Sequence, residues 1–184
     1  MIQPEDGILL VADPFLKDPN FMRSVVLLCR HNINEGSFGF SLNRELDQTL
    51  DEFLPGFENF PYKVFLGGPV QVDTIHYLHK YPDLIAGSRE VIDGIYWGGD
   101  FEMMKKFLND GLIEENNIKF FLGYSGWEAG QLDNEIKEGT WLTVKGNRKI
   151  AFDVPADEAW RAGVKLLGSD YEMMINFPID PQLN

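Results

Sequence analysis

Short apolar stretches bounded by turn residues fill the first part of the chain, and they predict strands. Residues 7–13 and 24–32 are apolar runs rich in β-branched residues, so each predicts a buried strand. Residues 36–44 place an apolar side chain at every second position from Phe38 to Leu42, which predicts a half-buried strand. Because a turn-rich segment separates the last two runs, we expect them to form a hairpin.

Strands and helices are mixed in the rest of the chain. Further strands are predicted at residues 63–70, 74–81, 90–99, 118–126, 141–146 and 149–154, the last two paired around Gly146-Asn147. Helices are predicted at residues 46–54, 101–110, 127–138 and 156–167. This order predicts an α+β fold, a single domain spanning 1–184 with a mixed, largely antiparallel β-sheet surrounded by helices. The C-terminal tail, 169–184, is expected to pack on the body of the domain.

Composition and charge narrow the classes of partner and the compartment. The 184 residues carry 16 Lys and Arg against 29 Asp and Glu, a net charge of −13, which argues against broad binding of nucleic acid or anionic membranes. The start of the chain has no basic leader before its apolar run, and no apolar run is long enough to span a bilayer. A single cysteine suits a reducing cytoplasm, so we expect a cytoplasmic protein with no membrane association.

One small basic cluster stands against the acidic background. It consists of Lys145, Arg148 and Lys149, at the turn between the two last predicted strands. Three cations are too few to hold nucleic acid against the repulsion of the whole chain, and no helix-turn-helix pattern with a basic recognition helix is present. The sequence therefore argues against direct DNA binding.

The segment Gly-Tyr-Ser-Gly-Trp places Ser125 at a predicted strand-to-helix turn, where a nucleophile elbow would hold its serine. That elbow needs glycine where Trp127 stands, and it needs a histidine later in the chain, whereas His79 is the last one. A capping box explains the residues better, with Ser125 as N-cap and Glu128 reaching back to it. A weaker alternative is that the glycine-flanked helix start binds an anion.

The predicted helix 127–138 has two different faces. The face expected to contact the core is formed by Ala129, Leu132 and Ile136. The opposite face is formed by Trp127, Gln131, Asn134 and Glu138. A tryptophan at the head of a polar stripe indicates a contact surface or the wall of a cleft. The alternative is that Trp127 packs on the adjacent loop and the other side chains are solvated.

The cysteine and the histidines are candidate reactive or metal-binding groups. Cys29 and His31 are two apart on a predicted strand and should share a face, so they could form a thiolate–imidazole pair, or Cys29 could simply be buried. His76 and His79 form an HxxH, but residues three apart on a strand face opposite sides. We therefore predict no metal site, and no pattern calls for a cofactor.

Two glycine-rich turns could let a ligand approach the backbone closely. They are Gly67-Gly68-Pro69 and Gly98-Gly99-Asp100. Neither has the Lys-Ser/Thr pair of a P-loop or the spacing of a dinucleotide fingerprint, so tight turns explain them equally well.

Four segments carry a resemblance to a known family. They are LLVADPFLKDPNFMRSVVLLCRHN, GSFGFSLNR, VFLGGPVQVDTIHYLH and LGYSGWEAGQLDNEIKEGTWLTV. Through them the chain resembles the YqgE/AlgH family of bacterial proteins, from Gly7 to Gly168, and the Gly-Tyr-x-x-Trp-x-x-Gly-Gln-Leu order is the most specific match. One departure is Glu45, which follows Asn43-Arg44 where the family commonly has proline.

The resemblance implies a compact α+β fold, a cytoplasmic location and a label of transcriptional regulator, but no particular reaction. The positions that match the family motif, and that we take as a candidate ligand or partner surface, are Cys29, His31, Asn32, Asn43, Gly67, Gly68, Pro69, Gly123, Tyr124, Trp127, Gly130 and Gln131. Our leading hypothesis is a non-enzymatic binding or regulatory protein that acts through a protein partner or small ligand. The alternative is an enzyme or thiol redox sensor that uses Cys29 near His31.

Overall fold

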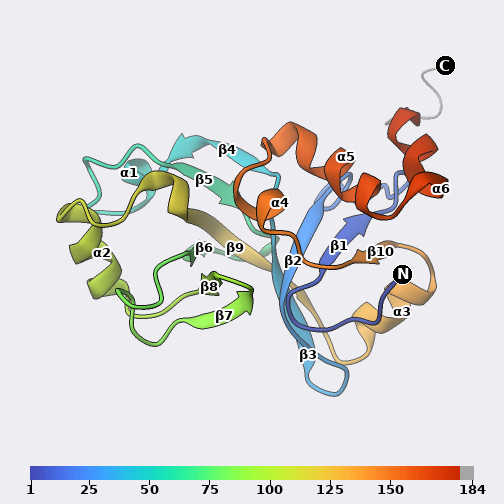
Figure 1. Ribbon diagram of the computed structural model, residues 1–184, viewed down its shortest axis with the longest axis horizontal. Coiled ribbons are helices and arrows are strands. Elements are labelled where there is room, and N and C mark those ends of the chain that lie inside the picture. Colours follow the sequence, from blue (N-terminus) through green and yellow to red (C-terminus); the bar gives the residue numbers. More distant parts are fainter. Residues whose placement is uncertain (179–184) are drawn as a thin grey trace.

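A single hydrogen-bonded network of strands forms the framework of the molecule (Figure 1). The computed structural model describes residues 1–178. Its strands are β1 (Leu9–Ala12), β2 (Val25–Asn32), β3 (Gly36–Ser41), β4 (Glu45–Thr49), β5 (Lys63–Leu66), β6 (Val70–His79), β7 (Arg89–Ile92), β8 (Ile95–Trp97), β9 (Ile118–Trp127) and β10 (Trp141–Val144). The helices are α1 (Leu50–Phe53), α2 (Phe101–Asn109), α3 (Gln131–Lys137), α4 (Arg148–Phe152), α5 (Ala156–Leu166) and α6 (Ser169–Glu172), with short 3₁₀ helices η1 (Glu115–Asn117) and η2 (Met173–Asn176).

The strand order is β10-β1-β2-β3-β9-β6-β8-β7, with β5 paired to β9 and β4 paired to β5. All pairings between these strands are antiparallel except β5 with β9, which is parallel. The predicted α+β fold with a mixed, largely antiparallel sheet is therefore confirmed, as is the hairpin of β2 and β3. The ten-residue strand β9 joins the two halves of the sheet, because its beginning pairs with β5 and β6 and its end with β3.

Three apolar clusters hold the helices against the sheet. One lies between the sheet and α4 and α5, and includes Leu27, Phe40 and Trp160. A second covers the opposite face of β1 and β2 and contains Leu132 of α3. The third packs α2 against β5, β6 and β9. Figure 1 shows α2 and α6 at opposite ends of the long axis.

Three element predictions were wrong, each because pairing or capping overrides the local pattern. Residues 46–54 are not one helix: β4 pairs with β5, and the helix α1 begins only at Leu50. Residues 149–154 form no strand, because the Asn147 side chain accepts the backbone N–H groups of Lys149 and Ile150 and starts α4. Residues 90–99 contain the hairpin of β7 and β8 rather than one strand, with Gly94 in the left-handed conformation at its turn.

The described part of the C-terminal tail lies against the domain. Tyr171, Met174 and Ile175 pack on the apolar cluster beneath α5, and the Arg23 guanidinium donates to the carbonyl oxygen of Phe177. These contacts extend the core beyond α5. The rest of the predicted packed tail, residues 179–184, lies outside the described residues.

Candidate functional site

A cleft of about 780 Å³ opens on the sheet where β3, β6, β8 and β9 lie side by side. Its lining residues are Arg30, Glu35, Gly36, Ser37, Phe38, Val70, His76, Trp97, Tyr124, Gly126, Trp127, Glu128 and Gln131. We call this the aromatic cleft. An open cleft with apolar walls and a few polar groups is the usual form of a binding site.

The walls of the aromatic cleft are built by strand pairing. Phe38 of β3 pairs with Gly126 of β9, and Tyr124 lies two residues before Gly126, so both rings project from the same face of the sheet. The Phe38 ring lies 4.8 Å from the Trp97 ring and 6.1 Å from the Tyr124 ring, centroid to centroid. Because Gly126 has no side chain, the Tyr124 ring and Val70 can pack closely above it, where a Cβ atom would lie 3.2 Å from Tyr124.

His76 of β6 completes the wall and carries an unsatisfied polar atom. Its ring lies 5.4 Å from Phe40 and 5.9 Å from Tyr124, and its Nε2 atom is buried without a hydrogen-bond partner among the described residues. Burial among these rings lowers the pKa of His76 below its usual value. The imidazole is therefore neutral at pH 7 and adds no charge to the cleft.

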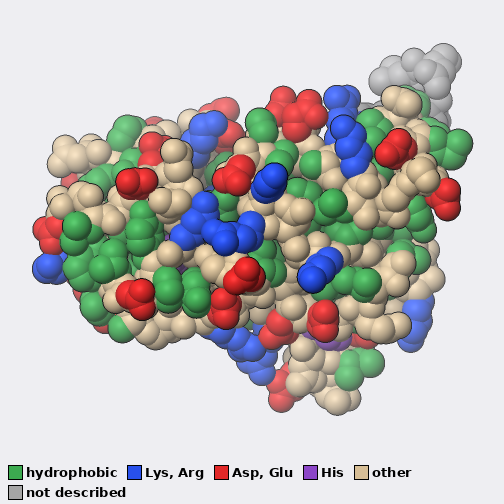
Figure 2. Space-filling view, in the orientation of Figure 1, with side chains coloured by type: hydrophobic (Ala, Val, Ile, Leu, Met, Phe, Trp, Pro, Cys, Tyr) green, Lys and Arg blue, Asp and Glu red, His purple; other side chains and the backbone are tan. Residues whose placement is uncertain are grey.

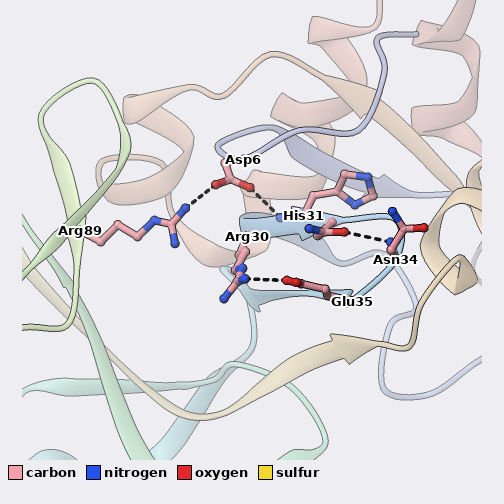
Figure 3. Close-up of polar contacts among 7 residues, drawn as sticks. Asp6, Arg30, His31, Asn34, Glu35 and Arg89 are labelled. Atoms are coloured by element: carbon pink, nitrogen blue, oxygen red, sulfur yellow. Dashed lines mark hydrogen bonds and ion pairs between the residues drawn. The ribbon is translucent and has the colours of Figure 1, made fainter.

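Polar groups lie at the hairpin end of the aromatic cleft, and most of them are already paired. Arg30 and Glu35 form an ion pair at 2.8 Å, and the neighbouring Arg89 pairs with Asp6 at the same distance (Figure 3). Asp6 also accepts the backbone N–H of His31. The two arginine charges are thus balanced by carboxylates before any ligand arrives.

Trp127 does not head a polar helix face, contrary to the sequence-based prediction. It is the last residue of β9, which pairs through Gly126 with β3, and α3 begins only at Gln131 after Gly130 turns with a φ of 71°. Its ring packs 5.9 Å from Trp141 and 6.3 Å from Phe21, and the side chain is buried. Trp127 therefore touches the aromatic cleft at its edge while its ring belongs to the core.

Ser125 is not a helix N-cap, so the predicted capping box is wrong. It lies inside β9, fully buried, and its hydroxyl donates to the carbonyl oxygen of Gly67 at 2.8 Å. The backbone N–H of Glu128 is instead accepted by the Gln131 side chain at 3.0 Å. Ser125 fastens the β5–β6 connection to β9, which is a structural role.

Cys29 and His31 lie on opposite faces of the sheet, which corrects the prediction that they share one. A bulge between Leu28 and Arg30 adds one residue to β2 and reverses the alternation beyond it. Cys29 packs beside Leu27 in the cluster beneath α5, whereas His31 bonds Ser37 at 2.8 Å and lies 3.9 Å from Asp133 of α3. The reversal leaves no thiolate–imidazole pair.

The thiol of Cys29 lies in a setting that suppresses reactivity. It is 1% exposed, and its nearest polar contact is the carbonyl oxygen of Leu27 at 3.7 Å. Burial raises the pKa of Cys29 well above its usual range. The thiol therefore stays protonated and covered in the folded protein.

The glycine turn 67–69 meets β9 directly beside the aromatic cleft. A Cβ atom on Gly68 would collide with the backbone of Tyr124 and Ser125, and one on Gly67 would collide with the carbonyl oxygen of Gly123. Gly123 itself has a φ of 65°. Gly67, Gly68 and Gly123 thus allow the chain to cross β9 at van der Waals distance, and exposed Pro69 follows them.

The remaining candidate positions lie apart from the aromatic cleft. Asn32 accepts the backbone N–H of Asn34 in the hairpin turn. Asn43 accepts the N–H of Val25 at 2.9 Å and donates to the carbonyl of Arg23. The twelve candidates therefore divide between the cleft, with Tyr124, Trp127 and Gln131 along its lining, and positions that fix turns and strands.

The histidines of the HxxH face opposite sides of β6, as predicted. His76 lies in the aromatic cleft, while His79 is fully buried on the other face and bonds the carbonyl of Gly98 at 2.9 Å. Within residues 1–178, no group of three His, Cys, Asp or Glu side chains is placed to hold a metal ion. None of the helices in this range is long and apolar enough to cross a membrane.

Lys119 is a buried cation that the sequence analysis did not single out. Its Nζ donates to the carbonyl oxygens of Leu42 and Ala151 at 2.9 and 3.3 Å, and it lies 4.0 Å from the Phe65 ring centroid. Burial lowers its pKa to about 7. The sequence does contain a signal for this buried cation, because Lys119 lies between Ile118 and Phe120 in a predicted strand that is otherwise apolar at its start.

The basic cluster forms no extended cationic surface. Lys145, Arg148 and Lys149 line a cavity that they share with Glu5, Asp6 and Asp93. Figure 2 shows acidic and basic side chains interspersed over the visible face rather than gathered into one basic field. The three cations of the basic cluster therefore have carboxylates in the same lining.

The architecture is that of an α+β domain with a mixed, largely antiparallel sheet, and comparison with known proteins shows its family. The AlgH-like family model matches residues 9–172. The chain is 43% identical over 178 residues to a UPF0301 protein of Chlorobium limicola, covering 97% of this chain and 95% of that one. It is 39% identical over 179 residues to a UPF0301 protein of Cytophaga hutchinsonii, covering 97% and 98%. The chain therefore belongs to the AlgH-like family.

Two solved structures share the fold. The solution structure of the AlgH protein from Pseudomonas aeruginosa superposes with a TM-score of 0.73 at 28% identity, covering 97% of each chain. The crystal structure of protein DIP2367 from Corynebacterium diphtheriae gives a TM-score of 0.74 at 20% identity, covering 96% of this chain and 94% of that one. The second likeness concerns the fold alone.

Three residues of the aromatic cleft were missed by sequence reasoning as site residues: Phe38, His76 and Trp97. The alternation predicts Phe38 on the apolar side of a half-buried strand, and the HxxH pattern raises His76 only as a metal ligand. Their meeting depends on the order β3-β9-β6-β8, which brings together segments far apart in the chain. The local signal was only that each is an aromatic or imidazole side chain on a predicted strand.

Proposed function

We propose that this protein is a non-enzymatic binding protein that acts through a partner or ligand seated in the aromatic cleft. The observation that carries the proposal is the convergence of Phe38, Trp97 and Tyr124 around an open volume of about 780 Å³. Aromatic side chains supply much contact area at a low entropic cost, and they dominate the energy of many interfaces.

The chemistry of the cleft supports binding over catalysis. Its one histidine is neutral, and its lining cation is held by Glu35. The thiol alternative loses support, since Cys29 is covered and His31 lies on the other face of β2. A regulatory role, as the label of the family suggests, would then be exerted through partner binding. A cytoplasmic location fits the single free cysteine, because free thiols stay reduced in that compartment.

The test is capture with matched variants. Immobilised wild type, Trp97→Ala, Tyr124→Ala and the control Phe101→Ala are exposed to bacterial lysate, and retained proteins and small molecules are identified by mass spectrometry. Phe101 is a partly exposed aromatic on α2, away from the cleft. We expect a species held by wild type and control and lost from both cleft variants. Equal retention by all four proteins would overturn the proposal.

A further inference from the structure

The charges around the aromatic cleft are not balanced, and the excess is negative. Its lining holds one cation, Arg30, and two carboxylates, Glu35 and Glu128. Glu35 neutralises Arg30 at 2.8 Å, while Glu128 is exposed and forms no ion pair among the described residues. The unbalanced charge of the lining is therefore the Glu128 carboxylate, in a chain whose net charge is −13.

Phe38, His76, Trp97 and Tyr124 line one volume with their rings. Phe38 lies edge-to-face with Trp97 at an interplanar angle of 61°, and with Tyr124 at 79°, so the three rings are inclined to one another rather than stacked flat. Aromatic rings that line one space bind a cation when it lies over the negative face of a ring. A neutral His76 in the same wall does not oppose a cation.

We infer that the aromatic cleft binds an arginine side chain presented by a segment of a partner protein. The inference rests on the proposed binding function and names its ligand chemistry. A guanidinium stacks on aromatic faces through its plane, and the Glu128 carboxylate in the same lining forms no ion pair among the described residues and offers it a counter-charge. The cleft, at about 780 Å³, is larger than one side chain, so residues flanking the arginine also have room.

An anionic ligand fits these observations less well. The lining offers a single cation, and Arg30 is already paired with Glu35. The nearby Arg89 is held by Asp6 (Figure 3). An anion would have to break one of these pairs and would also meet Glu128, whereas a cation meets aromatic faces and an unpaired carboxylate.

The experiment uses peptides that differ at one position. The probe is acetyl-Ala-Ala-Arg-Ala-Ala-amide, compared with the same peptide carrying citrulline, phenylalanine or glutamate in place of arginine. Binding is followed by NMR through the indole N–H resonance of Trp97 and the backbone amides of Tyr124 and Gly126. We expect the arginine peptide to bind about fivefold or more tightly than its citrulline isostere, since a cation–π contact of about 1 kcal/mol corresponds to that ratio.

Variants separate the charge from the rings. Trp97→Leu keeps apolar volume but removes a ring face, and Glu128→Gln removes the exposed charge without disturbing the core. Both should weaken binding of the arginine peptide, whereas Phe101→Leu and Glu138→Gln, the latter at the far end of α3, should not. Amide spectra of each variant confirm that it is folded.

Each outcome either supports or overturns the inference that the cleft binds arginine. Stronger binding of the arginine peptide, weakened by Glu128→Gln, supports the inference. Equal or tighter binding of the citrulline or phenylalanine peptide at Trp97 overturns the cationic ligand but leaves a binding cleft in place. If no peptide shifts Trp97, the arginine inference is overturned, and the capture experiment decides the broader proposal separately.

Discussion

The indole nitrogen of Trp127 lies 2.8 Å from Oε2 of Glu135, and the indole nitrogen of Trp141 lies 2.9 Å from the same oxygen. One carboxylate on α3 thus accepts both donors, while its other oxygen accepts the Gln131 side chain at 2.8 Å. Two tryptophan rings from separate strands are fixed through a single acidic residue. Because Gln131 also lines the aromatic cleft, Glu135 connects the core beneath α3 with the edge of the cleft.

We predict that Glu135→Leu destabilises the protein by about 2 kcal/mol or more, because two indole N–H donors lose their acceptor in a largely buried setting. Glu135→Gln should cost less, since an amide oxygen can still accept from the indoles. The free energy of unfolding in urea, followed by tryptophan fluorescence, measures both. Glu138→Gln, an exposed change at the C-cap of α3, is the control and should stay within about 0.5 kcal/mol of wild type. A Glu135→Leu protein as stable as this control would contradict the prediction.

Lys119 predicts a particular dependence of stability on pH. Its pKa is about 7 in the folded protein, against about 10.4 in an unfolded chain. Between these values the unfolded chain binds more protons, so this group makes the free energy of unfolding rise with pH. The rise should reach about 1 kcal/mol between pH 7 and pH 8, and it should vanish well below pH 7, where both states are protonated.

The comparison is with Lys119→Met, which keeps most of the stem but cannot titrate. Urea unfolding of both proteins at pH 5.5, 7 and 8 gives the difference between their free energies of unfolding at each pH. The variant also loses the hydrogen bonds to Leu42 and Ala151, and this loss changes the difference by the same amount at every pH. Above about pH 8.5 the raised pKa of Cys29 acts in the opposite sense, because the unfolded thiol ionises first. Parallel curves below that pH would show that Lys119 does not titrate as described.

Gly68 should tolerate no side chain. Gly68→Ala places a methyl group against the backbone of Tyr124 and Ser125, neither of which can move without breaking β9, so we expect a loss of about 3 kcal/mol or more, or failure to fold. The matched control is Gly126→Ala on β9, where the nearest atom belongs to the movable Tyr124 ring. Thermal unfolding of both variants is the measurement. Similar melting temperatures for the two would show that the close approach at Gly68 is not required.

Cys29 should be inert in the folded state. Because the thiol is buried and stays protonated, its alkylation by iodoacetamide should proceed only through unfolding and accelerate sharply near the urea midpoint. Since His31 is on the other face, His31→Gln should leave the rate per unfolded molecule unchanged. Rapid labelling in buffer, slowed by His31→Gln, would restore the thiol-sensor alternative.

Local patterns predicted those parts of the fold that depend on near neighbours. The β2–β3 hairpin and α2, which is capped by Asp100, were predicted because the signals lie within a few residues. The strand 118–126 was predicted, but Trp127 was assigned to the following helix, because its pairing with Ser37, far away in the chain, leaves no local signal. The bulge at Cys29 is likewise set by the partner strand, so the alternation of β2 could not reveal it.

Some residues of the aromatic cleft could be predicted from the family resemblance, and others could not be predicted from the sequence. The family resemblance pointed to Tyr124, Trp127 and Gln131, which do line the aromatic cleft. Whether the candidate surface binds anything stays a prediction. Trp97 could not be recognised, because its neighbourhood follows from the pairing of β8 with β6 and not from its own flanking residues.

The position of β1 between β2 and β10 has a consequence for biosynthesis. Leu9 of β1 pairs with Leu27 of β2 and with Val144 of β10. One edge of β1 therefore has no partner strand until β10, near the end of the chain, has been synthesised. On the ribosome, the backbone N–H and C=O groups on the β10 side of β1 stay unpaired until most of the protein has emerged, and an unpaired strand edge can pair wrongly with other chains. The yield of native protein should therefore depend on how long β1 stays unpaired, or on a chaperone that binds it during that time.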